Sequence, residues 1–164
     1  MPMAGRVAER RLLEEVVDRA AAGVPGAVLV HGEAGIGKTR MVSEVCAAAG
    51  ACGITTVWGS CVRVGAIEAP YHPLVKGLEA WALDASEADR TAVLGSSRSV
   101  EDVLSDPGRN PATGLVGRLV AIERLVEGIA LHAPTILVVD DVQWQPLAIL
   151  CAYRPPACVR EPAR

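Results

Sequence analysis

Apolar residues recur along this 164-residue chain with two different spacings, and the two spacings predict the order of its elements. Apolar residues three and four positions apart are typical of amphipathic helices. They predict helices over residues 7–22, 38–49, 86–94 and 115–131, and a further helix that follows a turn at 70–73 and ends near 83. Uninterrupted apolar or β-branched runs predict strands over 27–31, 54–59, 135–141 and 147–153.

The order of these elements predicts the fold class. The strand at 27–31, the helix at 38–49 and the strand at 54–59 form a βαβ unit, and such units build parallel sheets. We therefore expect an α/β fold, in which helices cover both faces of a mostly parallel sheet as a three-layer sandwich. We expect one domain over residues 1–154 and a disordered tail over 155–164.

Charge and composition exclude several classes of protein. The net charge is −3, so the clustered cations that hold nucleic-acid phosphates are lacking, and we expect this segment to make no direct nucleic-acid contact. No apolar run approaches the length of a membrane-spanning helix, and charged residues interrupt the N-terminal region where a signal peptide needs an apolar stretch. We expect a cytoplasmic protein without membrane contact.

Cysteine spacing argues against a zinc site. The chain contains no Cys-x2-Cys pair, and its histidines lie far in sequence from its cysteines. We expect reduced and mostly buried thiols at all five positions, which are Cys46, Cys52, Cys61, Cys151 and Cys158.

Residues 32–39 have the Gly-x4-Gly-Lys-Thr spacing of a phosphate-binding loop, between a predicted strand and a predicted helix. Gly32 and Gly37 allow backbone conformations that a side chain disfavours, so successive N–H groups can point at an anion. The helix that begins near Lys38 adds its positive N-terminal end. We expect Lys38 to reach the β- and γ-phosphates and the Thr39 hydroxyl to ligate Mg²⁺. The other candidate binding residues of this stretch are Glu33, Ala34, Gly35, Ile36 and Arg40.

Two adjacent acids supply the second part of the expected site. Asp140 and Asp141 end the predicted strand at 135–141, and an α/β sheet binds its ligand at the carboxyl ends of its strands. We expect Asp140 to be the metal partner, through water, and Asp141 to orient an attacking water as the candidate catalytic residue. The Asp141 carboxylate reaches one methylene less far than a glutamate would.

Four segments, "GRVAERRLLEEVVDRA", "VLVHGEAGIGKTR", "APYHPLV" and "ILVVDDVQW", occur in this order. Together they resemble the N-terminal part of the origin-recognition-like AAA ATPase module of large bacterial LuxR-type transcriptional regulators and related signal-transduction ATPases with numerous domains. The resemblance covers about residues 5–154 and implies a P-loop fold that binds ATP and Mg²⁺. It also implies that Gly5 and Arg6 lie beside the adenine, and that the remaining regulator domains are partners.

The chain departs from the family pattern at several points. Val7 stands where an acid commonly follows the arginine, and the helix that the family has after Trp144 is absent. Residues 142–146 are too few for a parallel crossover, so we expect 147–153 to run antiparallel to the preceding strand. We carry no γ-phosphate-sensing role over to Arg154. The family's helical lid and later domains do not follow, so we expect a module that is incomplete on its C-terminal side.

Three functional hypotheses remain open from the sequence. The first is an ATP–Mg²⁺ binding module that acts as a nucleotide switch with slow or no hydrolysis. The second is a small-molecule P-loop kinase, for which Arg90, Arg98 and Arg109 are candidate lid residues. The third is a remnant that binds nothing. A GTPase is disfavoured because the guanine-reading Asn-Lys-x-Asp pattern is missing.

Overall fold

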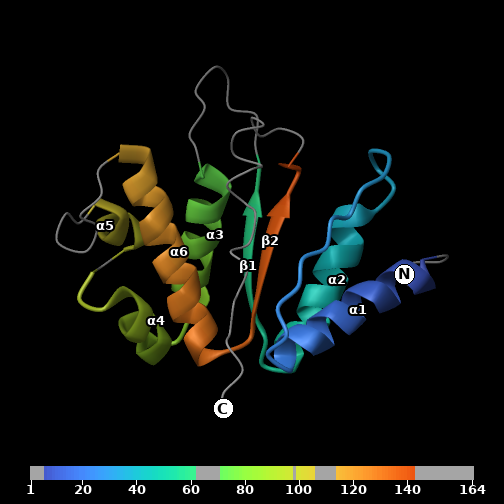
Figure 1. Ribbon diagram of the computed structural model, residues 1–164, viewed down its shortest axis with the longest axis horizontal. Coiled ribbons are helices and arrows are strands. Elements are labelled where there is room, and N and C mark those ends of the chain that lie inside the picture. Colours follow the sequence, from blue (N-terminus) through green and yellow to red (C-terminus); the bar gives the residue numbers. More distant parts are fainter. Residues whose placement is uncertain (1–5, 62–70, 98, 106–113, 143–164) are drawn as a thin grey trace, which may run out of the picture.

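A computed structural model describes residues 6–61, 71–97, 99–105 and 114–142 of the chain, and its elements form three layers (Figure 1). A short sheet lies in the middle, with α1 and α2 on one side and α3 to α6 on the other. The elements are α1 Val7–Ala21, α2 Lys38–Ala51, β1 Thr55–Ser60, α3 His72–Asp84, α4 Glu87–Leu94, α5 Val100–Ser105, α6 Gly114–His132 and β2 Thr135–Asp140. This arrangement confirms the predicted α/β class.

The sheet consists of β1 and β2, which are parallel and in register from Thr55 opposite Thr135 to Ser60 opposite Asp140. Both strands are rich in β-branched residues, which fit a pleated and partly buried surface. Because the strands run in the same direction, Ser60 and Asp140 end at the same edge of the sheet. The predicted strands at 54–59 and 135–141 are therefore confirmed to within one residue at each end.

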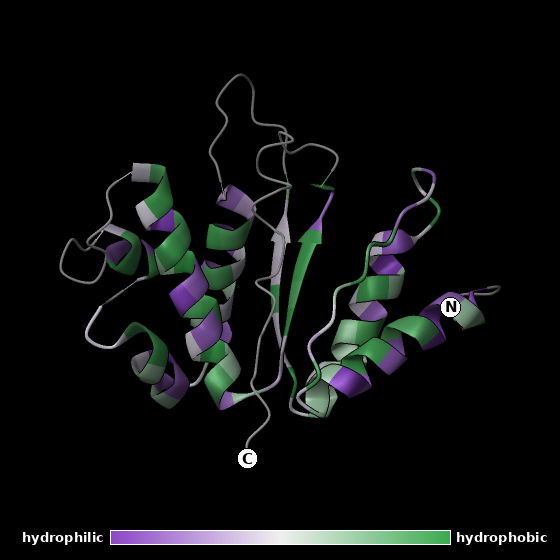
Figure 2. Ribbon diagram, viewed as in Figure 1, coloured by the Kyte–Doolittle hydropathy of each residue, from purple (hydrophilic) through white to green (hydrophobic). Residues whose placement is uncertain are grey.

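The predicted buried strand at 27–31 is wrong. These residues have no regular secondary structure, and the side chains of Val28 and Leu29 are 50% and 75% exposed. In Figure 1 the segment is an irregular connection that leads up to the start of α2, and Figure 2 shows its apolar colouring. An apolar run indicates a tendency to be buried but does not supply a hydrogen-bonding partner. In the structure β1 pairs with β2, and residues 27–31 form no strand. The βαβ unit expected from 27–31, 38–49 and 54–59 therefore does not form.

The main apolar core lies between the sheet and the α3–α6 layer. Val57 of β1 is fully buried and packs with Leu78 of α3 and Ile122 of α6. The helix α3 reaches β1 unusually closely, because glycines meet backbone at both contacts. A Cβ atom built on Gly59 would overlap the Pro73 carbonyl, and one built on Gly77 would lie 2.9 Å from the backbone of Trp58. The close contact fixes where α3 lies along the strand.

The predicted helices are present, and one short helix was not predicted. Ser99 and Asp102 form a capping box at the start of α5, in which each side chain bonds the other residue's backbone N–H group at 3.1 Å. The segment was missed because α5 has only six residues and precedes a turn-rich stretch. The predicted strand at 147–153 and the predicted tail at 155–164 lie outside the described residues. No described helix has both the length and the apolar character needed to cross a membrane.

Candidate functional site

The phosphate-loop sequence folds into a glycine-hinged loop that leads directly into α2. Gly32 and Gly37 have φ angles of 149° and 91°, which L residues with side chains rarely adopt. Gly37 is the N-cap residue of α2, and no side chain caps this helix end. The first N–H groups of α2 therefore remain available to an anion, and the helix dipole favours a negative charge there.

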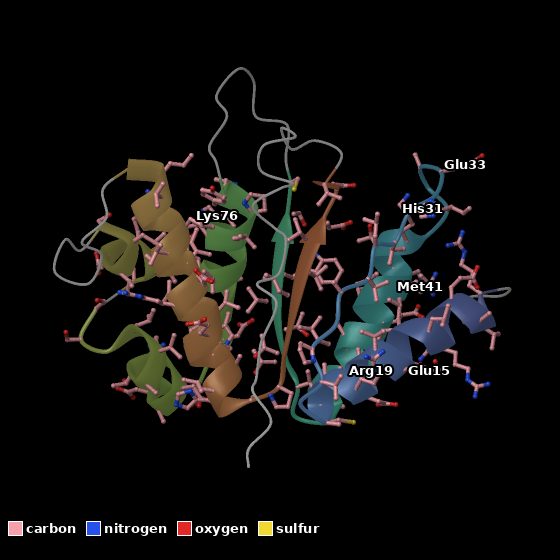
Figure 3. The ribbon with its side chains drawn as sticks, viewed as in Figure 1. Glu15, Arg19, His31, Glu33, Met41 and Lys76 are labelled. Atoms are coloured by element: carbon pink, nitrogen blue, oxygen red, sulfur yellow. The ribbon has the colours of Figure 1, made fainter. Side chains whose placement is uncertain are left out.

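The ammonium group of Lys38 lies inside this loop. Its Nζ atom donates hydrogen bonds to the carbonyl oxygens of Gly32 at 3.0 Å and Glu33 at 2.8 Å. Figure 3 shows Glu33 at the exposed tip of the loop, near His31. The lysine side chain thus folds back over the loop, which holds its positive charge beside the loop carbonyls near the start of α2.

The Thr39 hydroxyl connects the loop to the acidic end of the sheet. Its Oγ1 atom donates a hydrogen bond to Asp140 Oδ1 at 3.3 Å, although the two residues are far apart in the sequence. Asp140 Oδ1 also accepts a hydrogen bond from the backbone N–H of Asp141 at 3.0 Å. The structure therefore brings together the two residues that the sequence proposed as metal partners.

These two oxygen atoms fit a magnesium ion that is held largely by water and phosphate. Mg²⁺ prefers oxygen ligands and keeps several waters, so that one hydroxyl and one carboxylate are a sufficient protein contribution beside a nucleotide. Within the described ranges, no cluster of three or more acids, histidines or cysteines offers an all-protein metal cage. The donor set is thus suited to a metal that arrives with a phosphate ligand.

Asp141 has a left-handed backbone conformation, with φ at 57°. This conformation is uncommon for a residue other than glycine, and aspartate is among the residues that tolerate it best. It turns the chain sharply immediately after β2, and the side chain of Asp141 is exposed at that edge of the sheet. The two adjacent acids therefore have different environments.

Arg6 lies beside the loop helix rather than in the loop itself. It is the N-cap residue of α1 and lines a hollow of about 410 Å³ together with Arg10, Glu14, Met41 and Glu44. Met41 follows the phosphate loop by one turn of α2, and Figure 3 places it on the part of α2 that faces α1. The hollow therefore adjoins the loop helix on the side where α1 crosses it.

A family comparison now agrees with this geometry. A family model described as an AAA ATPase domain matches residues 2–149 of the chain. The chain belongs to the AAA ATPase domain family. Comparison with curated proteins and with solved structures gives no match. Within this AAA ATPase domain, the phosphate loop is the part that the sequence predicted most directly.

The sequence did not predict how α1 is attached to the loop helix of the AAA ATPase domain. Glu44 of α2 pairs with Arg40 at 2.9 Å and with Arg10 of α1 at 3.7 Å. Arg10 also pairs with Glu14 at 2.7 Å, and this hydrogen bond, with the charges of both glutamates, raises the pKa of Arg10. The helical spacing of Arg10 and Glu14, and of Arg40 and Glu44, indicates each pair within a helix. Nothing in the spacing indicates the bond between the helices.

Proposed function

We propose that this AAA ATPase domain is a nucleotide switch that binds ATP with Mg²⁺ and hydrolyses it slowly or not at all. The observation that carries the proposal is the Thr39–Asp140 hydrogen bond, which joins the phosphate loop to the acidic end of β2. A loop of this type and an acid at the end of a parallel strand are the two parts that P-loop ATPases use for phosphate and metal. Membership of the ATPase family supports the nucleotide-binding part of this proposal.

The parts of the site have different roles in the proposed binding. The N-terminal end of α2 holds the phosphate oxygens through backbone N–H groups, and Lys38 exchanges its loop carbonyl partners for phosphate oxygens. Thr39 would supply its hydroxyl oxygen to a bound Mg²⁺ and Asp140 would hold the ion through water, and the ion would neutralise phosphate charge. Arg6 and Met41 border the hollow that we propose for the adenine.

Slow turnover follows from the chemistry of the acidic pair. We propose that Asp141 orients the attacking water, and its short side chain and exposed position hold that water loosely. A loosely positioned nucleophile loses much of the rate advantage that fixed geometry provides. The bound nucleotide then persists long enough to act as a signal, as in the LuxR-type regulators and signal-transduction ATPases that the sequence resembles. The other domains of such a regulator would be the partners that read the signal.

The two lysines of the chain provide a matched test. Lys38 lies in the loop, whereas Lys76 lies on α3, on the other side of the sheet, and pairs with Glu79 at 2.6 Å (Figure 3). ATP–Mg²⁺ at a hundredfold excess over its dissociation constant should stabilise the purified chain by about 2.7 kcal/mol. Lys38→Ala should remove most of this gain in a thermal unfolding assay, and Lys76→Ala should keep it.

Two outcomes would contradict the proposal. One is an ATP-induced shift in melting temperature that is the same in the Lys38→Ala protein as in the unchanged protein. The other is ATP turnover that appears only when a small-molecule phosphate acceptor is added, because this would indicate a kinase. GTP should be compared with ATP at the same concentrations, and an equal response would show that the adenine assignment is wrong.

A further inference from the structure

The hollow between α1 and α2 contains one arginine that is held by both helices. The Nε atom of Arg10 donates a hydrogen bond to Glu14 of its own helix at 2.7 Å, and a terminal nitrogen of its guanidinium group lies 3.7 Å from Glu44 of α2. The N–H bonds of a guanidinium group lie in its plane, so the two carboxylates occupy its edges. The flat faces of the group remain, and 46% of the Arg10 side chain is exposed.

The spacing of these residues places them on the helix faces that border the hollow. Arg6, Arg10 and Glu14 follow one another at intervals of four residues, which puts them on one stripe of α1. Met41 and Glu44 are three residues apart and share a face of α2. Because Glu44 meets Arg10, the stripe of α1 faces this side of α2. The hollow of about 410 Å³ between them is within the usual range for small-molecule sites.

Met41 provides the apolar surface of the hollow. Its side chain is only 3% exposed, yet it borders the hollow from the side of α2. The thioether of methionine is polarisable and makes favourable contacts with aromatic rings. Met41 also lies three residues after Lys38, which is about 4.5 Å along the helix axis. A base whose phosphates are held at the start of α2 can therefore reach this surface.

The charges around the hollow are largely paired already. Glu44 also pairs with Arg40 of α2 at 2.9 Å, and Arg11 pairs with Glu15 at 3.3 Å. An anionic ligand would have to displace the carboxylates of Arg10 to reach the edges of its guanidinium group. A flat, uncharged ring contacts an exposed face of the same group and displaces nothing. The hollow therefore favours a neutral aromatic ring over an anion.

We propose that the guanidinium group of Arg10 stacks on the nucleobase, with Glu14 and Glu44 as the positioning residues that fix its plane. This inference rests on the proposed nucleotide function and names the residue that contacts the base. Arginine stacks on aromatic faces through both its charge and its planar shape. Exposed ion pairs add little to stability, so the contribution of the two glutamates is to orient the plane rather than to strengthen the fold. Met41 contacts the base from α2.

The test compares the affinity of the full chain for ATP with its affinity for inorganic tripolyphosphate, both measured with Mg²⁺ by titration calorimetry. A change of charge near the phosphates affects both ligands, so the ratio of the two dissociation constants isolates the contact with the base. Arg10→Leu should lower the preference for ATP by about threefold to fivefold, as expected for loss of a partly exposed cation–π contact. The matched control is Arg19→Leu, which removes the same charge near the other end of α1 and should keep the preference.

Two conservative variants separate stacking from attachment of α1. Arg10→Lys keeps the charge and can pair with both carboxylates, but it has no plane, so the preference for ATP should stay below that of the unchanged chain. Glu44→Gln should lower the preference by about twofold, because the plane loses one of its two supports. Full preference in the Arg10→Lys protein would show that Arg10 only attaches α1 to α2, and full preference in Glu44→Gln would refute the positioning role of Glu44.

The same measurements distinguish failure of this inference from failure of the proposed function. Unchanged preference in the Arg10→Leu protein would overturn the stacking contact while leaving nucleotide binding intact. Equal affinities of the unchanged chain for ATP and tripolyphosphate would show that the hollow holds no base, although the phosphate loop binds its ligand. If the unchanged chain binds neither compound, the proposed function is wrong, and the role of Arg10 is wrong with it.

Discussion

Thr39 at the start of α2 donates its hydroxyl hydrogen to Asp140 at the end of β2, across 3.3 Å. The bond joins two elements that are separated by most of the chain, and it fixes the distance between the phosphate loop and the acidic edge of the sheet. Both oxygen atoms are of the kind that Mg²⁺ accepts, so the same geometry that connects the elements would also suit the proposed metal position.

The first prediction concerns the division of labour between the two acids. Asp140→Asn should weaken Mg²⁺-dependent ATP binding by about tenfold, because it removes the charged oxygen beside Thr39. Asp141→Asn should leave binding unchanged and lower any turnover. Titration calorimetry with and without Mg²⁺ measures the first effect, and a phosphate-release assay measures the second. Equal losses of binding in both variants would refute the division.

The second prediction concerns the close contact between β1 and α3. Gly59→Ala should destabilise the fold by roughly 3 kcal/mol or more, because the new methyl group would overlap the Pro73 carbonyl and push the helix away. Gly50→Ala is the matched control. A Cβ at Gly50, within α2, meets nothing within 4 Å, and the substitution should stabilise by up to about 1 kcal/mol. Urea unfolding of both variants measures the difference, and similar stabilities would show that α3 does not lie where the structure places it.

The third prediction concerns thiol reactivity. Burial raises the pKa of the Cys46 thiol, and the neighbouring Thr56 side chain lowers it by less. Cys52, one residue beyond the end of α2, is exposed. Iodoacetamide at neutral pH should therefore modify Cys52 at least about tenfold faster than Cys46. Peptide mapping by mass spectrometry resolves the two sites, and comparable rates would mean that Cys46 does not lie on a buried face of α2.

The same thiol gives a pH dependence with a definite sign. Because the folded protein holds the Cys46 proton more tightly than the unfolded chain does, stability decreases as the pH rises above the unfolded value of about 8.5. Below that value both states are protonated, and this contribution does not change with pH. Unfolding free energies measured between pH 7 and pH 10 should decline less steeply in Cys46→Ala than in the unchanged chain.

The fourth prediction concerns the exposed apolar segment before the phosphate loop. Val28 and Leu29 are exposed, and within the described ranges β2 pairs with β1 alone. An amphipathic helix inserted between Pro146 and Leu147 would lengthen the connection that follows β2. The predicted strand at 147–153 could then be reached by a parallel crossover. The longer chain should remain soluble at higher concentration and hydrolyse ATP faster. Light scattering and phosphate release measure these effects, and an unmodified chain that is equally soluble and equally active would contradict the prediction.

The sequence predicted the elements better than their pairing. Helical spacing located α1 and α6 to within about a residue, because burial of one helix face requires that spacing over many turns. The apolar run at 27–31 looked the same as the run that forms β2, yet only the latter has a strand beside it. Strand pairing depends on contacts with distant parts of the chain, and a short sequence segment does not contain that information.

The candidate site shows the same contrast. The spacing of residues 32–39 predicted the unusual backbone conformations of Gly32 and Gly37, because these are local consequences of that sequence. The position of Asp140 followed from the rule that parallel strands present their carboxyl ends together. The pairing of Glu44 with Arg10 depends on the crossing of α1 over α2, which no local pattern specifies.

The parallel pairing of Thr55 with Thr135 also has a consequence for how the chain folds. The helices α3 to α6 lie between the two strands in sequence, so the sheet requires a long loop to close, whereas each helix forms from local contacts. We expect helical structure within the first milliseconds of refolding and the sheet only later. Thr39 and Asp140 meet only when the sheet has closed, so the ability to bind nucleotide should be acquired in the slowest kinetic phase. A fluorescent ATP analogue added during refolding would then record the final step rather than the first.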